Sequence, residues 1–522
     1  MSFWRGDYRG LSLALSSAPL GVDQPEPDWS GMKVSCLNKR LLEEWGMGSD
    51  IIDGGDVERW MKQAPHPFAM AYAGHQYGHF TMLGDGRALL VGEWQNASNQ
   101  CYDIHLKGSG PTTFARRGDG QATLRSMLRE FLISEALHGL GVPTTRSLMV
   151  LETPHKVWRD YDQRGGVLVR VAPHHVRIGT LEYAIRALNP HDYALYAGAV
   201  LQRTTQYWAK EPSLGREMSL YTPSSWRPEA VVAFFEEWSL RQAELLAHWM
   251  RIGFVHGVLN TDNISLLGVT MDLGPCAFVN AYDLNRSFSS IDAQGRYAWG
   301  HQVEVMEWNA SVLLSCLLPL LADDGNTTNA MPVARGLLDR FRAQCQEAQT
   351  WMHFRKLGLD PAKGHGDDRV LSLVEEWQSW LTVQQPDYAL VYLKLEKILS
   401  ETLEGGSSKD SGSSLDLDSI FNANPQSLPS GAWLSGWLRA LGESDGGASA
   451  ALHRMQENNP SIIPRNHWVE QALDQRVLRG SSGLWDELRI AMENPYQRHD
   501  RYRHLNQPPQ HGDAGYQTFC GT

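Results

Sequence analysis

The hydrophobic pattern changes its period about a third of the way along the chain. Up to residue 178, short apolar runs predict strands at 102–106, 148–158 and 167–171, interrupted by one helical period that begins at Thr123. A polar segment with two glycines at 163–166 predicts a turn between the last two strands. Beyond residue 178 the period is helical, and it predicts helices at 193–209, 228–250, 300–322, 332–356, 367–382 and 388–402. Strands followed by helices are typical of the α+β class.

Composition divides this α+β chain further. The run EGGSSKDSGSSLDL has no core-forming content and predicts a flexible linker. We expect an N-terminal segment that wraps the first lobe, a strand-rich lobe, a helical lobe, this linker and a C-terminal region, at residues 1–60, 61–178, 179–402, 403–416 and 417–522.

Charge and cysteine content exclude several classes of protein. The net charge of -12 disfavours a general nucleic-acid binder, because counterion release needs clustered Lys and Arg. Six scattered Cys without a C-x-x-C pattern favour a reducing compartment. The sequence contains no run of about 18 apolar residues, so it predicts no membrane-spanning helix. We therefore expect a cytoplasmic monomer without a nucleic-acid or membrane partner, with an organellar presequence left open as an alternative.

A glycine-rich stretch lies between 67 and 94. Strand-like runs on either side of Gly84-Asp85-Gly86 predict a hairpin, since Asp-Gly supplies the positive φ of a tight turn. Such a hairpin can cover phosphates, although it is not G-x-G-x-x-G and a plain turn remains the simpler interpretation. His75 and His79 are four residues apart, but the neighbouring glycines disfavour a helix and hence a metal pair.

A lysine and a glutamate follow in an order that carries chemistry. Lys107 ends the strand predicted at 102–106, and Glu130 lies on the next helix. Protein kinases use a strand lysine and a helix glutamate in this order to orient the ammonium onto nucleotide phosphates. A surface ion pair is the alternative.

The stretch GFVHGVLNTDNISLLGVTMDLG, at 253–274, contains the second part of that layout. Counted from His256, Asn263 falls at the position of the kinase metal-binding Asn, and Asp272-Leu273-Gly274 matches D-F-G. Val258 occupies the position of the kinase catalytic Asp, so Asp262 is the nearest replacement base. An apolar run at 264–269 predicts a strand between them, and ordinary turn chemistry is the alternative to a metal site.

Two arginines accompany these residues. Arg170 is embedded in an apolar strand, and Arg177 follows seven residues later. A buried guanidinium needs an anionic partner. That partner is either an internal carboxylate or a phosphate, whose oxygens match the guanidinium fork.

Four segments carry a resemblance to a known family. The chain resembles the selenoprotein O family in YAGHQYGHFTMLGDGRALLVGE, LKGSGPTTFARRGDG, RVAPHHVRIGTLE and GFVHGVLNTDNISLLGVTMDLGP, and more weakly through NNPSIIPRNHW to the end. The resemblance implies a bilobal protein-kinase-like fold. It also implies that ATP binds in a flipped orientation and that AMP is transferred to Ser, Thr or Tyr hydroxyls of target proteins.

The resemblance also assigns roles to matching residues. Asp262 would accept the proton, and Asn263 and Asp272 would hold Mg²⁺ or Mn²⁺. Nucleotide contacts would come from Gly84, Gly86, Arg87, Lys107, Asp119, Gly120, Arg170, Arg177 and Asp272, with Glu130 paired to Lys107. A Cys276–Cys520 disulfide would make activity redox-dependent, with a buried inert Cys276 and a frayed tail as the alternative.

Two other functions fit the same residues. A conventional protein kinase would use the same metal site. A catalytically inactive, nucleotide-binding pseudokinase scaffold is suggested by Val258.

Overall fold

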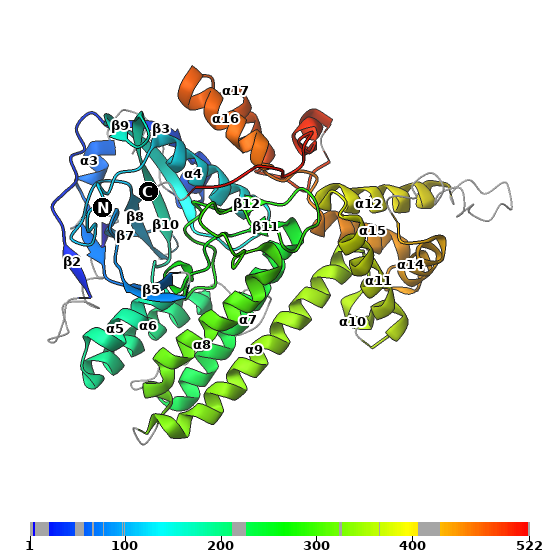
Figure 1. Ribbon diagram of the computed structural model, residues 1–522, viewed down its shortest axis with the longest axis horizontal. Helices are drawn as coiled ribbons and strands as arrows, with labels where there is room; N and C mark the ends of the chain where they lie inside the picture. The colour runs from blue at the N-terminus through cyan, green and yellow to red at the C-terminus, as the bar shows by residue number, and fades with distance from the viewer. Residues whose placement is uncertain are drawn as a thin grey trace.

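The computed structural model describes residues 4–5, 20–46, 57–64, 67–76, 78–96, 98, 100–210, 226–322, 326–364, 366–405, 428–498 and 500–519. Within these ranges an antiparallel sheet lies at one end of an elongated molecule, and long helices lead away from it (Figure 1). The expected mixture of α-helix and β-strand is confirmed, and the strands of the main sheet pair antiparallel.

The main sheet has eight strands in the described part of the chain. Its order is β2-β4-β7-β8-β10-β9-β3, and β1 pairs with β7. The strand bounds are β1 Trp4–Arg5, β2 Gly21–Asp23, β3 Lys33–Leu37, β4 Phe68–Met70, β7 Ala88–Gln95, β8 Cys101–Lys107, β9 Arg146–Trp158 and β10 Asp162–Ala172. The strands predicted at 102–106, 148–158 and 167–171 are therefore confirmed, and segments before residue 60 add edge strands to the sheet.

Alternation along the strands gives the sheet two packed faces. Ile104 and Leu106 of β8 pack in a core with residues of α2 (Lys39–Glu44) and α3 (Val57–Met61). Leu168 of β10 packs on the opposite side with α4 (Leu124–Gly139). Helix α4 begins directly after the expected Thr123, whose hydroxyl caps it by accepting from the Ser126 N–H.

Three local predictions were wrong. Gly84-Asp85-Gly86 does not close a hairpin, because β6 (His79–Met82) pairs with β5 (Ala73–Gln76), whereas β7 pairs with β4 and β8. Gly165 and Gly166 lie inside β10 beside a bulge rather than in a turn. The run 264–269 does not form a strand: Ser265 and the adjoining Thr270 each make a single β-bridge. Within the described chain, the strands that flank this run in sequence are β11 (Phe254–Val255) and β12 (Ala277–Phe278).

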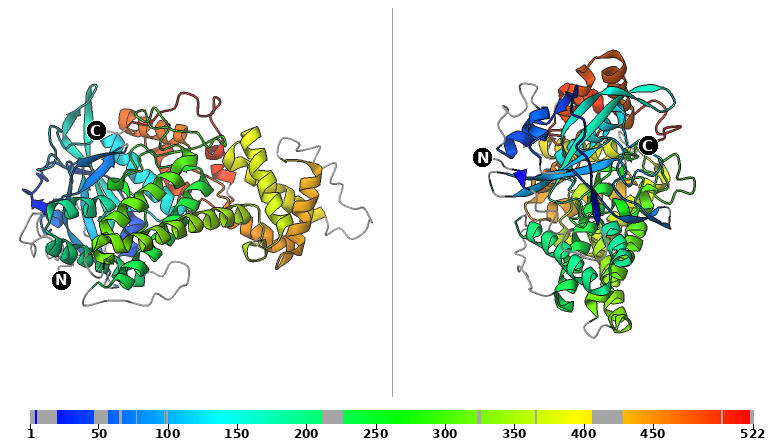
Figure 2. Two further views of the ribbon diagram at one scale, coloured as in Figure 1. Left: turned by 60° about the horizontal axis from the view of Figure 1, so that its bottom comes forward. Right: turned by 90° about the vertical axis from the view of Figure 1, so that its left-hand side faces the viewer.

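Most of the helices lie in two groups (Figure 2). The central group packs α7, α8 and α9 together below the sheet, and α9 leads to a distal group of α10 to α15. Helices α16 and α17 return to pack on α4. The bounds are α5 Ile178–Ala187, α6 Pro190–Lys210, α7 Pro228–Ile252, α8 Gln302–Leu321, α9 Thr327–Lys356, α10 Pro361–Gly364, α11 Asp368–Gln384, α12 Tyr388–Gly405, α14 Gly431–Glu443, α15 Gly447–Asn458, α16 Asn466–Arg479 and α17 Gly483–Ala491. Short 3₁₀ turns lie at η3 Thr261–Asn263, η4 Trp299–His301 and η6 Asp500–Asn506.

The segment Trp299–Leu321 is, among the described residues, the one helix whose length and composition would suit a membrane span, with mean hydropathy 1.3. Val305, Leu313 and Leu317 on it are buried in the largest core cluster. That is the ordinary environment of an apolar core helix.

Two predictions from the sequence concern residues outside the described ranges. Most of the linker predicted at 403–416 lies outside the described residues, which stop at Gly405 and resume at Leu428. Cys520 also lies outside them, so the Cys276–Cys520 disulfide stays a prediction. The division into five parts stays a prediction as well.

Candidate active site

A cleft of about 910 Å³ opens between the sheet and the loop that follows α7. Strands β7, β8 and β10 and helix α4 form one wall, and residues 258–275 form another. Residues 516–519 also line the cleft, and in Figure 1 the last segment of the chain runs back toward the sheet. Residues distant in sequence therefore meet in one polar cavity.

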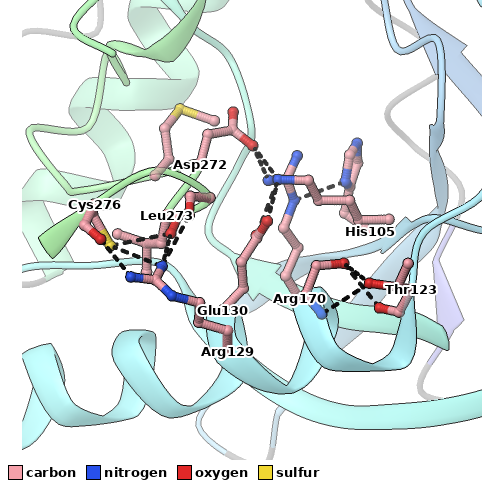
Figure 3. A network of polar contacts seen from close by, with 12 residues as sticks. His105, Thr123, Arg129, Glu130, Arg170, Asp272, Leu273 and Cys276 are labelled. Carbon is pink, nitrogen blue, oxygen red and sulfur yellow. Dashed lines mark hydrogen bonds and ion pairs between the residues drawn. The ribbon is translucent and has the colours of Figure 1, made fainter. Parts of the chain in front are cut away.

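Asp272 is the centre of the charge cluster (Figure 3). Its Oδ1 accepts from Lys107 Nζ at 3.0 Å and from Arg170 Nη1 at 2.6 Å, and its Oδ2 accepts from Arg177 Nη1 at 3.1 Å. Burial alone would raise the pKa of this carboxyl, but the three cations, Arg170 foremost, hold the pKa well below its usual range. Asp272 has a φ of 58°, a left-handed backbone that only Asp, Asn and Gly adopt readily.

The predicted pairing of Lys107 with Glu130 is confirmed. Lys107 Nζ lies 2.8 and 3.0 Å from the two carboxylate oxygens of Glu130, and both side chains are buried. The helix α4 packs on β9 and β10 of the same sheet, and β10 pairs with β8, which carries Lys107. The ammonium is thereby fixed at the wall of the cleft.

The two arginines have different surroundings. Arg170 has an internal carboxylate, Asp272, as its partner in this structure, which was one of the two predicted alternatives. Arg177 is 2% exposed, and its Nη1 also donates to the Asp262 carbonyl at 2.6 Å. Its Nε and Nη2 have no hydrogen-bond partner among the described residues, although the guanidinium lies over the Tyr72 ring. Buried donors without a partner are typical of a site that receives an anion.

Asp262 lies in η3, where the short turn brings it to the floor of the cleft. Its Oδ1 is buried and has no hydrogen-bond partner within the described chain. Burial raises the pKa of this carboxyl to about 6, although Arg177 opposes the shift. A carboxylate with a raised pKa in a cleft is a candidate general base.

Strand β5 packs against the turn that carries Asp262. The His75 N–H donates to Thr261 Oγ1 at 2.9 Å, which fixes the turn. Gly74 approaches so closely that a Cβ placed there would lie 2.2 Å from Asp262 Oδ1. His75 itself contacts Glu182 at 2.8 Å rather than pairing with His79. No group of three or more His, Cys, Asp or Glu that could hold a metal occurs in the described part of the chain.

The chemistry of the predicted metal ligands suits a magnesium ion. Asn263 donates from Nδ2 to the Val258 carbonyl at 2.9 Å, which fixes the orientation of its amide. Asn263 and Asp272 both line the cleft, and together they offer one amide oxygen and one carboxylate. Mg²⁺ is commonly held by one or two such protein oxygens together with substrate phosphates. These residues therefore fit the ion.

The remaining predicted nucleotide contacts divide into two sets. Gly86 and Arg87 line the cleft. Gly84, Asp119 and Gly120 are outside its lining. Gly84 packs against Phe114, Asp119 pairs with Arg159 at 2.7 Å, and Gly120 packs against the Gly110 backbone at a φ of 65°.

Arg129 was missed from the sequence. It lies beside Glu130 on α4 and donates to the backbone carbonyls of Gly274, at 2.9 Å, and Cys276, at 2.6 Å (Figure 3). One helix thus holds both Lys107, through Glu130, and the loop that carries Asp272, through Arg129. Contacts to backbone oxygens leave no residue pattern, so no signal in the sequence identifies this role.

Cys276 and the tail lie against the same loop. Cys276 is fully buried, burial raises the pKa of its thiol, and its Sγ donates to the Leu273 carbonyl. Thr518 Oγ1 donates to the Pro275 carbonyl at 2.7 Å, next to Cys276. The end of the described chain therefore lies close to this cysteine.

A cleft with three buried cations, an oxygen-donor pair and a carboxylate of raised pKa is typical of enzymes that bind nucleoside triphosphates. Comparison with known proteins defines the family. The family model described as "Protein adenylyltransferase SelO" matches residues 29–489. The chain belongs to this family.

Curated relatives agree with the family model. "Protein nucleotidyltransferase YdiU" of Bacillus cereus (strain B4264) is 38% identical over 463 residues, which cover 88% of this chain and 86% of the relative. The proteins of the same name from Bacillus thuringiensis (strain Al Hakam) and Bacillus anthracis (strain CDC 684 / NRRL 3495) are 38% and 37% identical with the same coverage.

Proposed function

We propose that the protein transfers AMP from ATP to Ser, Thr or Tyr hydroxyls of other proteins. The acceptor oxygen attacks the α-phosphorus, the bond from that phosphorus to the α–β bridging oxygen breaks, and pyrophosphate leaves. The observation that carries the proposal is the set of cations on Asp272, next to a buried carboxylate that has a free oxygen. Membership of an adenylyltransferase family supports it.

The cations suit a pyrophosphate leaving group. Charge accumulates on the leaving pyrophosphate as the bond breaks, so donors fixed beforehand stabilise the transition state more than the ground state. Lys107, Arg170 and Arg177 are fixed by Glu130, His105 and the Asp262 carbonyl respectively. We propose that ATP lies with its β- and γ-phosphates toward these three side chains.

Asp262 is the proposed proton acceptor. Its free Oδ1 would take the proton of the attacking hydroxyl, and the loose transition state of phosphoryl chemistry asks for only a weak base. The base would stand at Asp262 rather than at Val258, which lines the same cleft without a polar group.

We also propose a kinase-like division of labour. The sheet with α4 would be the first lobe and the helices from α5 onward the second, with ATP between them. Asn263 and Asp272 would hold Mg²⁺ or Mn²⁺, which would neutralise phosphate charge when bound. On this arrangement Asp272 would hold the ion in place of its present cation partners, and those cations would be available to the phosphates.

Isotope position distinguishes this function from its rivals. Protein label from ATP labelled at the α-phosphate, with none from γ-labelled ATP, is the expected result, detected on a gel with purified protein, Mg²⁺ and a mixture of candidate acceptor proteins. Label from the γ-phosphate alone would establish a conventional kinase. If neither label reaches protein while ATP still binds, the protein is an inactive scaffold, the alternative suggested by Val258 at the position of the kinase catalytic Asp.

Gly74→Ala is expected to lower AMP transfer roughly a hundredfold, because a displacement of about 1 Å at a reacting group has that effect. The added Cβ would meet Asp262 Oδ1 at 2.2 Å and push the carboxylate aside. Initial rates of α-label transfer measure the loss. Gly336→Ala on α9, where nothing lies within 4 Å of the new Cβ, is the matched control and should transfer normally. Unchanged transfer in Gly74→Ala would show that the position of Asp262 does not matter.

A further inference from the structure

Strand β8 presents a buried polar face and a buried apolar face. Ile104 and Leu106 point into the apolar core, and the alternate residues Asp103, His105 and Lys107 occupy the other face. All three are less than 7% exposed. Lys107 belongs to the charge cluster described above, whereas His105 does not line the cleft and reaches that cluster only through Arg170. A buried polar side chain two residues from Lys107 requires an explanation.

His105 is bound through both ring nitrogens. Arg170, its cross-strand neighbour on β10, donates from Nε to His105 Nδ1 at 3.0 Å (Figure 3). On the other side, His105 Nε2 lies 3.1 Å from Asp85 Oδ2, which also accepts from the Met70 N–H. An Arg Nε can only donate, so Nδ1 must be the acceptor and the ring hydrogen must be on Nε2, toward Asp85. These partners fix a single neutral tautomer.

The surroundings preserve that state. Burial, followed by the charges of Arg170 and Arg177, lowers the pKa of His105 well below its usual value, so the imidazole stays neutral. The ring of His175 stacks on it, with centroids 4.5 Å apart. The His175 backbone N–H donates to Asp103 Oδ2 at 3.0 Å, and the ring Nδ1 lies 3.4 Å from the same oxygen, so the stacked ring is itself anchored. Rotation of the His105 ring would break contacts on three sides.

We propose that His105, held by Asp85, is a positioning residue for Arg170 in ATP binding. Anchoring the guanidinium through Nε leaves both Nη groups for the cleft, and Nη1 already reaches Asp272 there. When a phosphate enters, the Nη donors exchange Asp272 for its oxygens without reorienting the side chain. The inference rests on the proposed function for the identity of the anion, a nucleoside triphosphate.

Two amide substitutions at His105 test the contacts of the two ring nitrogens separately. The amide oxygen of His105→Asn lies near the place of Nδ1 and keeps the acceptor for Arg170. The amide of His105→Gln reaches the place of Nε2, so it can still contact Asp85 but leaves Arg170 Nε without its acceptor. We expect the Kd for ATP with Mg²⁺, measured by titration calorimetry, to rise roughly tenfold in His105→Gln and to stay within about threefold of the original in His105→Asn.

A double-mutant cycle shows whether the effect passes through Arg170. In an Arg170→Met background, His105→Gln should change the Kd for ATP little, since the group that His105 positions is gone. An equal loss of affinity in both backgrounds, or equal affinity of His105→Gln and His105→Asn, would overturn the proposal. His353→Gln, at a buried histidine of α9 outside the cleft lining, controls for general loss of packing and should bind ATP normally.

The ATP-binding experiment tests the role of His105 independently of the proposed AMP transfer. Binding of unmodified ATP reports on His105 whether or not AMP is transferred. If the original protein binds ATP but transfers no α-label, the proposed function fails while the coupling between His105 and Arg170 is still measured.

Discussion

Asp262→Asn is expected to lower AMP transfer about a hundredfold or more while ATP binding stays near normal, since general bases typically contribute that much. The amide fills the same space in η3 but cannot accept a proton from the attacking hydroxyl. Lys107 and Arg170 keep their partners, and Arg177 keeps the backbone carbonyl of residue 262, which the substitution leaves in place. Initial rates of α-label transfer and the Kd for ATP, measured on the same preparation, separate chemistry from binding.

The pH dependence of the rate gives an independent check of that base. Because burial raises the pKa of Asp262 to about 6, the carboxyl is protonated and unable to accept a proton below that pH. Transfer should therefore rise with pH through about 6 and then level off, and Asp262→Asn should lack this rise. Asp283→Asn, a partly exposed carboxylate paired with Arg286 outside the cleft, serves as the charge-matched control. A normal rate in Asp262→Asn would refute the assigned role.

The central geometry of the site could be predicted from spacing along the chain. Lys107 ends a strand and Glu130 lies on the helix that packs on the same sheet, so order and period were enough to bring them together. Asn263 and Asp272 flank one loop, and they line one cleft with the lysine. Residues placed by regular elements or by one short loop leave this kind of signal.

Other parts of the site depend on tertiary contacts that no local pattern records. Arg129 acts on backbone carbonyls, and the tail around Thr518 reaches the cleft from the other end of the chain. The hairpin predicted at Asp85 failed because that carboxylate is buried against Met70 and His105, where its contacts outweigh the turn preference of Asp-Gly. Arg170 was known to need an anion, but only the fold shows that Asp272 is its partner in this structure.

Asp272→Asn is expected to abolish most transfer and also the dependence of ATP binding on Mg²⁺, because it removes the carboxylate proposed to hold the ion. Asn is chosen because it tolerates the left-handed φ of 58° at this position. Calorimetric titration of ATP with and without Mg²⁺ measures the binding effect. Full activity in this variant would refute the metal role, and retained Mg²⁺ dependence would assign the ion to other oxygens.

The same substitution should destabilise the protein without ligand by about 3 kcal/mol, since the buried Lys107, Arg170 and Arg177 would lose the partly buried carboxylate that they share. The pKa of Asp272 is lowered in the folded state, so its stabilisation is present above the unfolded pKa of about 4 and is lost as pH falls through the lower folded pKa. The gap in unfolding free energy between the original protein and Asp272→Asn should therefore narrow as the pH is lowered below about 4. Asp292→Asn is the matched control: this buried carboxylate accepts from the Arg296 and Tyr297 N–H groups outside the cleft. This substitution should lower stability yet leave Mg²⁺-dependent ATP binding intact, because Asp292 is not a proposed metal ligand. The comparison therefore separates the loss of a buried charge from the loss of a metal ligand.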